Sequence, residues 1–167
     1  MRTATVLSAV LAAGLTVGAT TAEAQTSASI QATATVLSAI TVTAGNNLQF
    51  GNVTPGVNKT VAIADGGAGT FSVAKGANTG VTLSFTLPTD LSTGGGDLLP
   101  IGSWTGGWNT AATPAGATLF TPSAGGSNTT VNAATALTVF VGATVSPAAA
   151  QAAGAYSGNV TMSVVYF

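Results

Sequence analysis

Apolar residues recur at every second position in several short segments of this chain, and that period constrains its fold more than any other feature. Successive side chains of a β-strand point to opposite faces of a sheet, so a period of two indicates strands with one buried face. An apolar period of 3.6 residues, which would indicate amphipathic helices, is not sustained. Gly-rich clusters such as "DGGAG", "STGGGD" and "SAGGSN" separate the segments and predict turns. The sequence therefore predicts an all-β protein built as a β-sandwich.

The predicted strands are short and lie close together along the chain. They are residues 39–43, 48–53, 60–64, 70–74, 81–87, 98–104, 117–120, 136–145 and 156–167. The segment "SPAAAQAAGAY", residues 146–156, is interpreted as the connection between the last two strands. We find no internal repeat of fixed length in the sequence, which argues against a solenoid.

The first 24 residues have the pattern of a secretory signal peptide that is cleaved off. Met1 and Arg2 supply a positive charge, an apolar run follows, and Ala22-Glu23-Ala24 matches the small-x-small cleavage pattern. The apolar run is too short to span a bilayer. We therefore expect an exported, secreted protein that does not span the membrane after cleavage and whose mature chain begins at residue 25.

The composition removes most of the usual chemistry. The chain has no cysteine and no histidine, so the commonest general base, the thiol nucleophile and the soft metal ligands are absent. The charged residues of the mature chain are Lys59, Asp65, Lys75, Asp90 and Asp97. So little charge offers no electrostatic surface for nucleic acid. We expect no enzyme, no catalytic residue, no metal, no cofactor and no nucleic-acid partner.

Trp104 and Trp108 in "GSWTGGWN" allow two interpretations. Large aromatic side chains near the end of a β-sandwich usually cover its core. Exposed aromatic rings on a loop can instead stack on sugars, which makes these two residues a candidate glycan platform.

The chain ends in "GAYSGNVTMSVVYF", which predicts a strand with one apolar face. Even-numbered positions from Tyr156 to Tyr166 are apolar except for Gly158, whereas odd-numbered positions are polar as far as Ser163. A shift of one residue would bury the polar set, so the register of this strand is strongly specified. A strand has two hydrogen-bonding edges, and the sequence does not show what pairs with the second edge of this final strand.

Two sets of residues resemble known subunits. Chaperone–usher pilus subunits end in a strand with a penultimate aromatic residue and a glycine fourteen positions from the C-terminus, and Tyr166 and Gly154 match these positions. The segments "LQFGNVTPG", "LTVFVGATVS" and "AGAYSGNVTMSVVY" resemble the bacterial exported domain-of-unknown-function family 4402. That family is similar in pattern to spore-coat-U and archaic chaperone–usher pilus subunits. The likeness extends from Ala32 to Tyr166, although this chain lacks the cysteine pair of many pilus subunits.

The resemblance implies an immunoglobulin-like (pilin-like) β-sandwich that lacks its last strand, over residues 37–167. It also implies a structural subunit of a surface fimbria or pilus, exported through the periplasm and active in cell adhesion. Its expected partners are further copies of itself, a periplasmic chaperone and an outer-membrane usher. The implied acceptor edge, which the chaperone would face first, comprises Gly154, Tyr156, Val160, Met162, Val164, Tyr166 and Phe167.

Residues 25–36 form a candidate donor strand that would fill the same gap in another copy. Its apolar positions are Ala28, Ile30, Ala32, Ala34 and Val36. The same alternation equally fits the first strand of a self-complete sandwich. The second functional hypothesis is therefore a self-complete secreted β-sandwich that binds a glycan or an envelope protein.

Overall fold

The computed structural model describes residues 26–76, 80–125, 127–132 and 135–167, so the predicted signal peptide lies outside the described residues. The described part of the chain is all-β and contains no helix. Its strands are β1 (Thr41–Ala44), β2 (Lys59–Val61), β3 (Gly69–Ala74), β4 (Val81–Thr86), β5 (Asp90–Ser92), β6 (Leu98–Asn109), β7 (Thr118–Phe120), β8 (Ser127–Val131), β9 (Ala136–Val145) and β10 (Thr161–Tyr166). Within these residues, no helix of the length and apolarity needed to cross a membrane occurs.

The chain divides into two compact units, Met1–Ala34 and Thr35–Phe167. In the first unit, the described residues 26–34 adopt neither helix nor strand, and their side chains are exposed. All the strands belong to the second unit, which is the sandwich.

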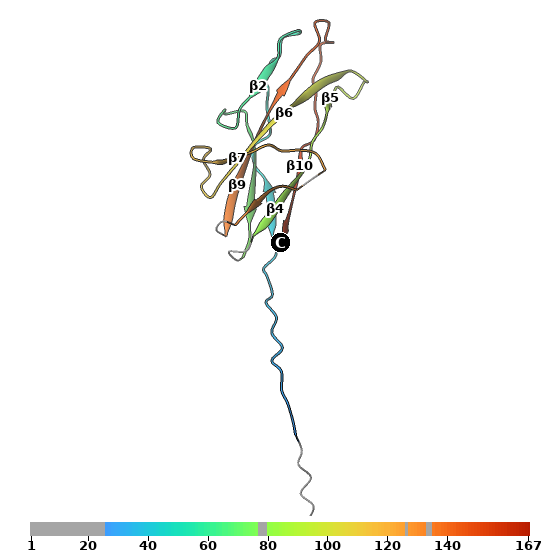
Figure 1. The fold of residues 1–167 in the computed structure, drawn as a ribbon. Coiled ribbons are helices and arrows are strands. Elements are labelled where there is room, and N and C mark those ends of the chain that lie inside the picture. The colour runs from blue at the N-terminus through green and yellow to red at the C-terminus, as the bar shows by residue number, and fades with distance from the viewer. Residues whose placement is uncertain (1–25, 77–79, 126, 133–134) are drawn as a thin grey trace, which may run out of the picture. The chain divides into compact units, whose positions relative to one another are not determined.

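Two antiparallel sheets make up the sandwich (Figure 1). The larger sheet has the order β1-β3-β9-β6-β5, with β2 paired to the end of β9 and β7 paired to β6. The smaller sheet has the order β10-β4-β8. The predicted β-sandwich is thereby confirmed.

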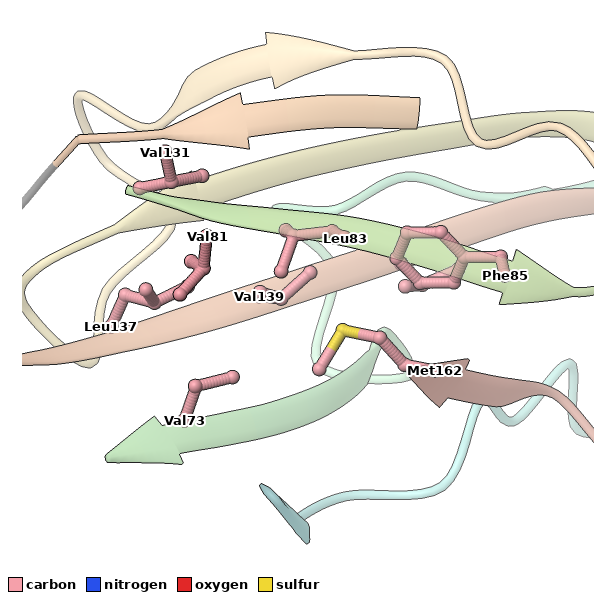
Figure 2. Packing of buried hydrophobic residues seen from close by; sticks show 9 residues of the cluster. Val73, Val81, Leu83, Phe85, Val131, Leu137, Val139 and Met162 are labelled. Atoms are coloured by element: carbon pink, nitrogen blue, oxygen red, sulfur yellow. The ribbon is translucent and has the colours of Figure 1, made fainter. Parts of the chain in front are cut away.

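The two sheets pack face to face over one apolar cluster, which we call the main core. It comprises Val73, Val81, Leu83, Phe85, Val131, Leu137, Val139, Val141 and Met162, all of them buried. Figure 2 shows side chains of β4 directed toward those of β3 and β9, with Met162 of β10 closing one side. The alternating apolar positions of each strand supply this cluster, as the period of two predicts.

A second apolar cluster lies along the same face of the larger sheet. We call it the groove cluster, and its buried members are Leu99, Ile101, Ala143 and Val145. Partly buried side chains pack against it from residues 48–53, from Leu91 and from Tyr156. It occupies the end of the sandwich where β2 and β5 lie, opposite the end marked by the C-terminus (Figure 1).

A bulge in β6 lets one strand supply both clusters. Opposite β9, the pairing shifts between Gly102 and Thr105, and Ser103 has a positive φ of 46°. Before the bulge the odd-numbered Leu99 and Ile101 are buried, whereas after it the even-numbered Trp104 and Trp108 pack against the main core. An inserted residue changes which positions face the core, because side chains alternate along a strand. The even-numbered tryptophans are therefore turned toward the core.

Most predicted strands are present, but their limits differ. The interval 136–145 is correct, and 70–74, 81–87 and 117–120 are correct to within one residue at each end. The prediction of a strand over 48–53 is wrong, since that segment is irregular although Leu48 and Phe50 point toward the groove cluster. Strands β5 and β8 are not predicted, because β5 is short and β8 consists mainly of Ser, Asn and Thr.

Candidate functional site

The candidate site is a groove between two strand edges, and β10 forms the first of them. Within the part of the chain that the structure describes, strand β10 pairs only with β4, from Thr161 opposite Thr86 to Tyr166 opposite Val81. Just before β10, Ser157 exchanges two backbone hydrogen bonds of 2.9 Å with Ser92. Residues 161–166 are therefore paired on one side, and their other side forms the edge of the smaller sheet, whereas Ser157 is paired with β5 of the larger sheet.

Strand β1 forms the second edge. Among the described strands it pairs only with β3, from Thr41 opposite Ala74 to Ala44 opposite Phe71. The pairing continues past the strand, since the Gly45 amide donates to the Thr70 carbonyl at 2.8 Å and the Gln49 amide donates to the Gly67 carbonyl at 2.8 Å. Residues 41–49 thus also have one paired side and one edge.

The two edges run in opposite directions and meet at both ends of the groove. At one end, the Tyr166 hydroxyl donates to the Ser38 carbonyl at 3.0 Å. At the other end, the Gly56 amide donates to the Ala148 carbonyl at 3.1 Å. Gly56 has a φ of 76°, which a residue with a side chain rarely adopts.

Toward the Gly56–Ala148 end, a cavity of about 1040 Å³ lies between the two edges, and no residue of β10 itself lines it. Its walls are residues 44–55 and 151–160, and apolar side chains of both clusters form its floor. These floor residues are Phe71, Leu91, Leu99, Ile101, Val141 and Val145. Polar side chains such as Asn46, Gln49 and Asn159 also line the groove. The site thus combines an apolar floor with two backbone edges that can form hydrogen bonds.

Gln151 holds the wall that leads into β10. Its side-chain amide donates to the Leu98 carbonyl at 3.0 Å and to the Tyr156 hydroxyl at 2.7 Å. The Tyr156 hydroxyl in turn donates to the Ala152 carbonyl at 2.8 Å, and the Ala148 amide donates to the Gln151 side-chain oxygen at 3.3 Å. This network fixes a segment that has no regular secondary structure.

The residues of the predicted acceptor edge fall into three places. Gly154, Tyr156 and Val160 line the groove. Met162, Val164 and Tyr166 belong to the main core or pack against it, which confirms the predicted apolar face of this strand. Phe167 is 65 % exposed, and its ring lies against Gly80, where an added Cβ atom would collide with it.

The candidate donor positions are exposed. Ala28, Ala32 and Ala34 are exposed, and the side chains of Ile30 and Val36 are 96 % and 93 % exposed. Residues 26–40 form no strand. In this structure, residues 27–36 are therefore not the first strand of their own sandwich. The first strand is β1.

Both tryptophans contact the apolar interior. Trp104 is partly buried and packs against the main core and the groove cluster, and Trp108 packs against the main core. Their packing agrees with the interpretation of these residues as a cover for the core. The interpretation as a glycan platform remains a hypothesis.

Three of the charged side chains make local hydrogen bonds to the backbone or to a neighbouring side chain. Asp65 accepts a hydrogen bond from the Ala62 amide at 2.8 Å within a turn, and Asp90 accepts one from the Thr89 hydroxyl at 2.9 Å. The Lys59 ammonium donates to the Asn52 carbonyl at 3.0 Å. Among the described residues, no group of three or more potential metal ligands is present.

Sequence reasoning did not identify the second wall of the groove. Within residues 44–55 the sequence predicts a strand over 48–53, and it predicts residues 146–156 only as a connection. The alternation of Leu48 and Phe50 with Gln49 was the available signal, because it marks a segment with one face toward the interior.

No family model matches this chain. No curated protein matches it significantly.

Proposed function

We propose that this protein is an exported structural subunit that assembles into a surface fimbria or related polymer by donor-strand addition. The observation that carries the proposal is the groove, whose two edges have no strand of the same chain between them in the described residues. Unpaired backbone groups beside an apolar floor form a template for an added strand.

The strand order supports an immunoglobulin-like sandwich that lacks its last strand. An immunoglobulin-like fold has strands A, B, E and D in one sheet and C, F and G in the other. Strands β1, β3, β9 and β6 have the arrangement of A, B, E and D, and β4 and β10 that of C and F. Strand G would lie beside β10, where the groove is.

Residues 26–36 have the length and pattern of the missing strand. They number as many residues as the edge from 156 to 166, and an extended segment of this size spans about 36 Å. Their apolar side chains would face the groove floor. If five small side chains bury about 60 Å² each, the hydrophobic contribution is roughly 7 kcal/mol before the cost of ordering the segment.

Turn chemistry favours a donor from a second copy over the chain's own N-terminus. To place Val36 beside Ile40 with both side chains inward, the chain would need a three-residue turn over Leu37, Ser38 and Ala39. Such turns usually place Gly or Asn at a position with positive φ, and this segment has neither. The same edge is open to another molecule without a turn.

The substitution Ile30→Asp tests the proposal in the full exported chain. A charged side chain cannot enter the apolar groove without a large desolvation cost, so this variant should be unable to donate its strand. It should remain monomeric in size-exclusion chromatography with light scattering, whereas the unmodified chain should form a ladder of multimers that resists SDS. A ladder from Ile30→Asp equal to that of the unmodified chain would show that residues 26–36 are not the donor.

The monomeric variant also keeps its own groove free, which permits the reciprocal experiment. A synthetic peptide of residues 26–36 should bind it and raise its thermal unfolding temperature. The same peptide carrying Ile30→Asp is the matched control and should have no effect. The absence of any difference between the two peptides would contradict the proposed groove-filling role.

A further inference from the structure

The end of the sandwich beside the groove exposes a second apolar surface. Val57 and Leu98 are 57 % and 55 % exposed, although both side chains are large and apolar. The bond from the Gly56 amide to the Ala148 carbonyl places Val57 next to residues 147–155. The bond from Gln151 to the Leu98 carbonyl places Leu98 beside the same segment. We call Val57, Leu98 and residues 147–155 the end surface.

The end surface suits a protein interface in its lack of charge and in its rigidity. Residues 147–155 carry no charge. The charged residues nearest to this surface in the sequence are Lys59, two residues after Val57, and Asp97, directly before Leu98. Interface centres are depleted of charged residues, whereas their rims are polar. The bonds of Gln151 already order this loop, so little conformational entropy is lost when a partner covers it.

The geometry of the groove identifies the occupant of this surface. Strand β10 runs from the end surface toward the contact between Tyr166 and Ser38. A donor strand antiparallel to β10 therefore ends, at its residue 36, beside the end surface. At the opposite end, the acceptor's own residues 38–40 lie beside Tyr166 and occupy the place where a donor's body would follow.

The link between donor strand and donor body is short. Ile40 already packs against the main core of its own sandwich, so only residues 37–39 separate the inserted strand from the next body. Three extended residues span about 10 Å. The next sandwich must then lie directly against the acceptor's end surface.

We propose that the end surface is a docking site for the sandwich of the next copy of this chain, which contacts it through the region of Leu37. This inference rests on the proposed donor-strand function and adds a second interface to it. Leu37 is 38 % exposed, which makes it available for such a contact. The interface is heterologous, so repeated contacts extend a chain of subunits instead of closing a dimer.

Cysteine cross-linking tests the contact directly, because the chain has no cysteine of its own. The full exported chain carrying Leu37→Cys and Leu98→Cys should form a covalent ladder under mild oxidation. The matched control combines Leu37→Cys with Leu119→Cys. Leu119 is 73 % exposed but lies on β7, opposite Gly107 of β6 and away from the end surface, so this pair should not cross-link.

A charge substitution provides the second measurement. Leu98→Glu should raise the protein concentration needed for half-assembly by about tenfold or more, while Leu119→Glu leaves it unchanged. Peptide 26–36 should stabilise an Ile30→Asp/Leu98→Glu chain as much as the Ile30→Asp chain, since the Leu98 side chain does not line the groove.

The outcomes separate the two proposals. Normal assembly of Leu98→Glu together with no Leu37–Leu98 cross-link would overturn the docking surface and leave the donor-strand function intact. Discrete covalent dimers of the Leu37→Cys variant would also overturn the docking surface. They would show that Leu37 of one copy contacts Leu37 of another copy and not the end surface. If the unmodified chain neither forms multimers nor binds peptide 26–36, the donor-strand function itself is overturned.

Discussion

The main core and the groove cluster are built on the same face of β9, yet they are covered differently. Val139 and Val141 lie under β4 and β10 of the smaller sheet and are 0 % and 1 % exposed. Ala143 and Val145 lie two and four residues after Val141 on the same strand and are also buried. Here, however, the irregular residues 48–53 and Tyr156 pack over them. The sandwich is thus closed by a full second sheet at one end and bordered by a groove at the other.

The difference arises where the smaller sheet stops. Strand β4 ends at Thr86, Pro88 follows, and the next strand, β5, pairs with β6 of the larger sheet. Proline cannot donate a ladder hydrogen bond and is found at strand ends and edges. The chain therefore leaves the smaller sheet at this point. The comparison teaches that one stretch of the central strand β9 lies in a closed core and the next stretch lies on the floor of an open groove.

The largest expected effect contrasts a charge placed in each region. Leu83→Asp, in the main core, should prevent folding, because a buried unpaired carboxylate costs more than about 5 kcal/mol. Leu48→Asp, on the groove wall, should leave the chain folded, since that side chain can reach the water in the groove, but should abolish binding of peptide 26–36. Circular dichroism and peptide titration measure the two effects. Equal loss of folding in both variants would show that the groove end is as closed as the core.

Truncation of a leucine in each region sharpens the contrast. Leu83→Ala should lower the free energy of unfolding by about 4 kcal/mol and Leu99→Ala by about 2 kcal/mol, because a cavity at the groove floor is open to water and to rearrangement. Urea unfolding in the Ile30→Asp background, followed by the fluorescence of Trp104 and Trp108, gives both values. A larger cost for Leu99→Ala would reverse the assignment of the main core as the principal source of stability.

Filling the groove should change one region and not the other. Peptide 26–36 at about one hundred times its dissociation constant should stabilise the Ile30→Asp chain by about 2.7 kcal/mol. Hydrogen exchange should then slow at residues 41–49 and 156–166, while amides of β9 at Val139 and Val141 keep their rates relative to global unfolding. Global stabilisation slows exchange at every amide to some extent. If exchange slows further, and by the same factor at every amide, the peptide does not bind at a local site.

The smallest effect concerns the contact that closes one end of the groove. Tyr166→Phe removes the hydrogen bond to the Ser38 carbonyl and should lower the unfolding free energy by about 1 kcal/mol. Peptide affinity should change little, because the ring itself still packs against the main core. Thermal unfolding and peptide titration of the same variant measure both quantities. A loss of peptide binding with unchanged stability would contradict this role.

The sequence predicts the strands whose apolar alternation survives unbroken. The interval 136–145 and the inward face of residues 156–166 follow directly from a period of two, although the strand predicted over 156–167 covers only Thr161–Tyr166. In β6 the bulge at Ser103 changes the phase of the pattern, so the strand extends five residues past its predicted end at Trp104. Strand β8 has polar side chains in place of the expected alternation, and its pairing with β4 is a long-range contact that local pattern does not encode.

The candidate site follows the same division. The acceptor edge was named from the final strand, whose residues lie together in the sequence. The opposite wall comes from residues 44–55, and only the pairing of β1 with β3 brings it across from Tyr156. The roles of Gln151 and Gly56 also depend on contacts with distant residues and carry no local signal.

The lengthwise course of the two groove edges has a mechanical consequence. Tyr166 and Ser38 lie at one end of the two strand edges and Gly56 and Ala148 at the other, so a strand added along both edges would run from one end of the sandwich toward the other. Tension between successive subunits would pull that strand along its own axis. Its hydrogen bonds to both edges would then bear the load together, in shear, instead of opening one after another. Such a junction would resist a pulling force far better than a peeling force.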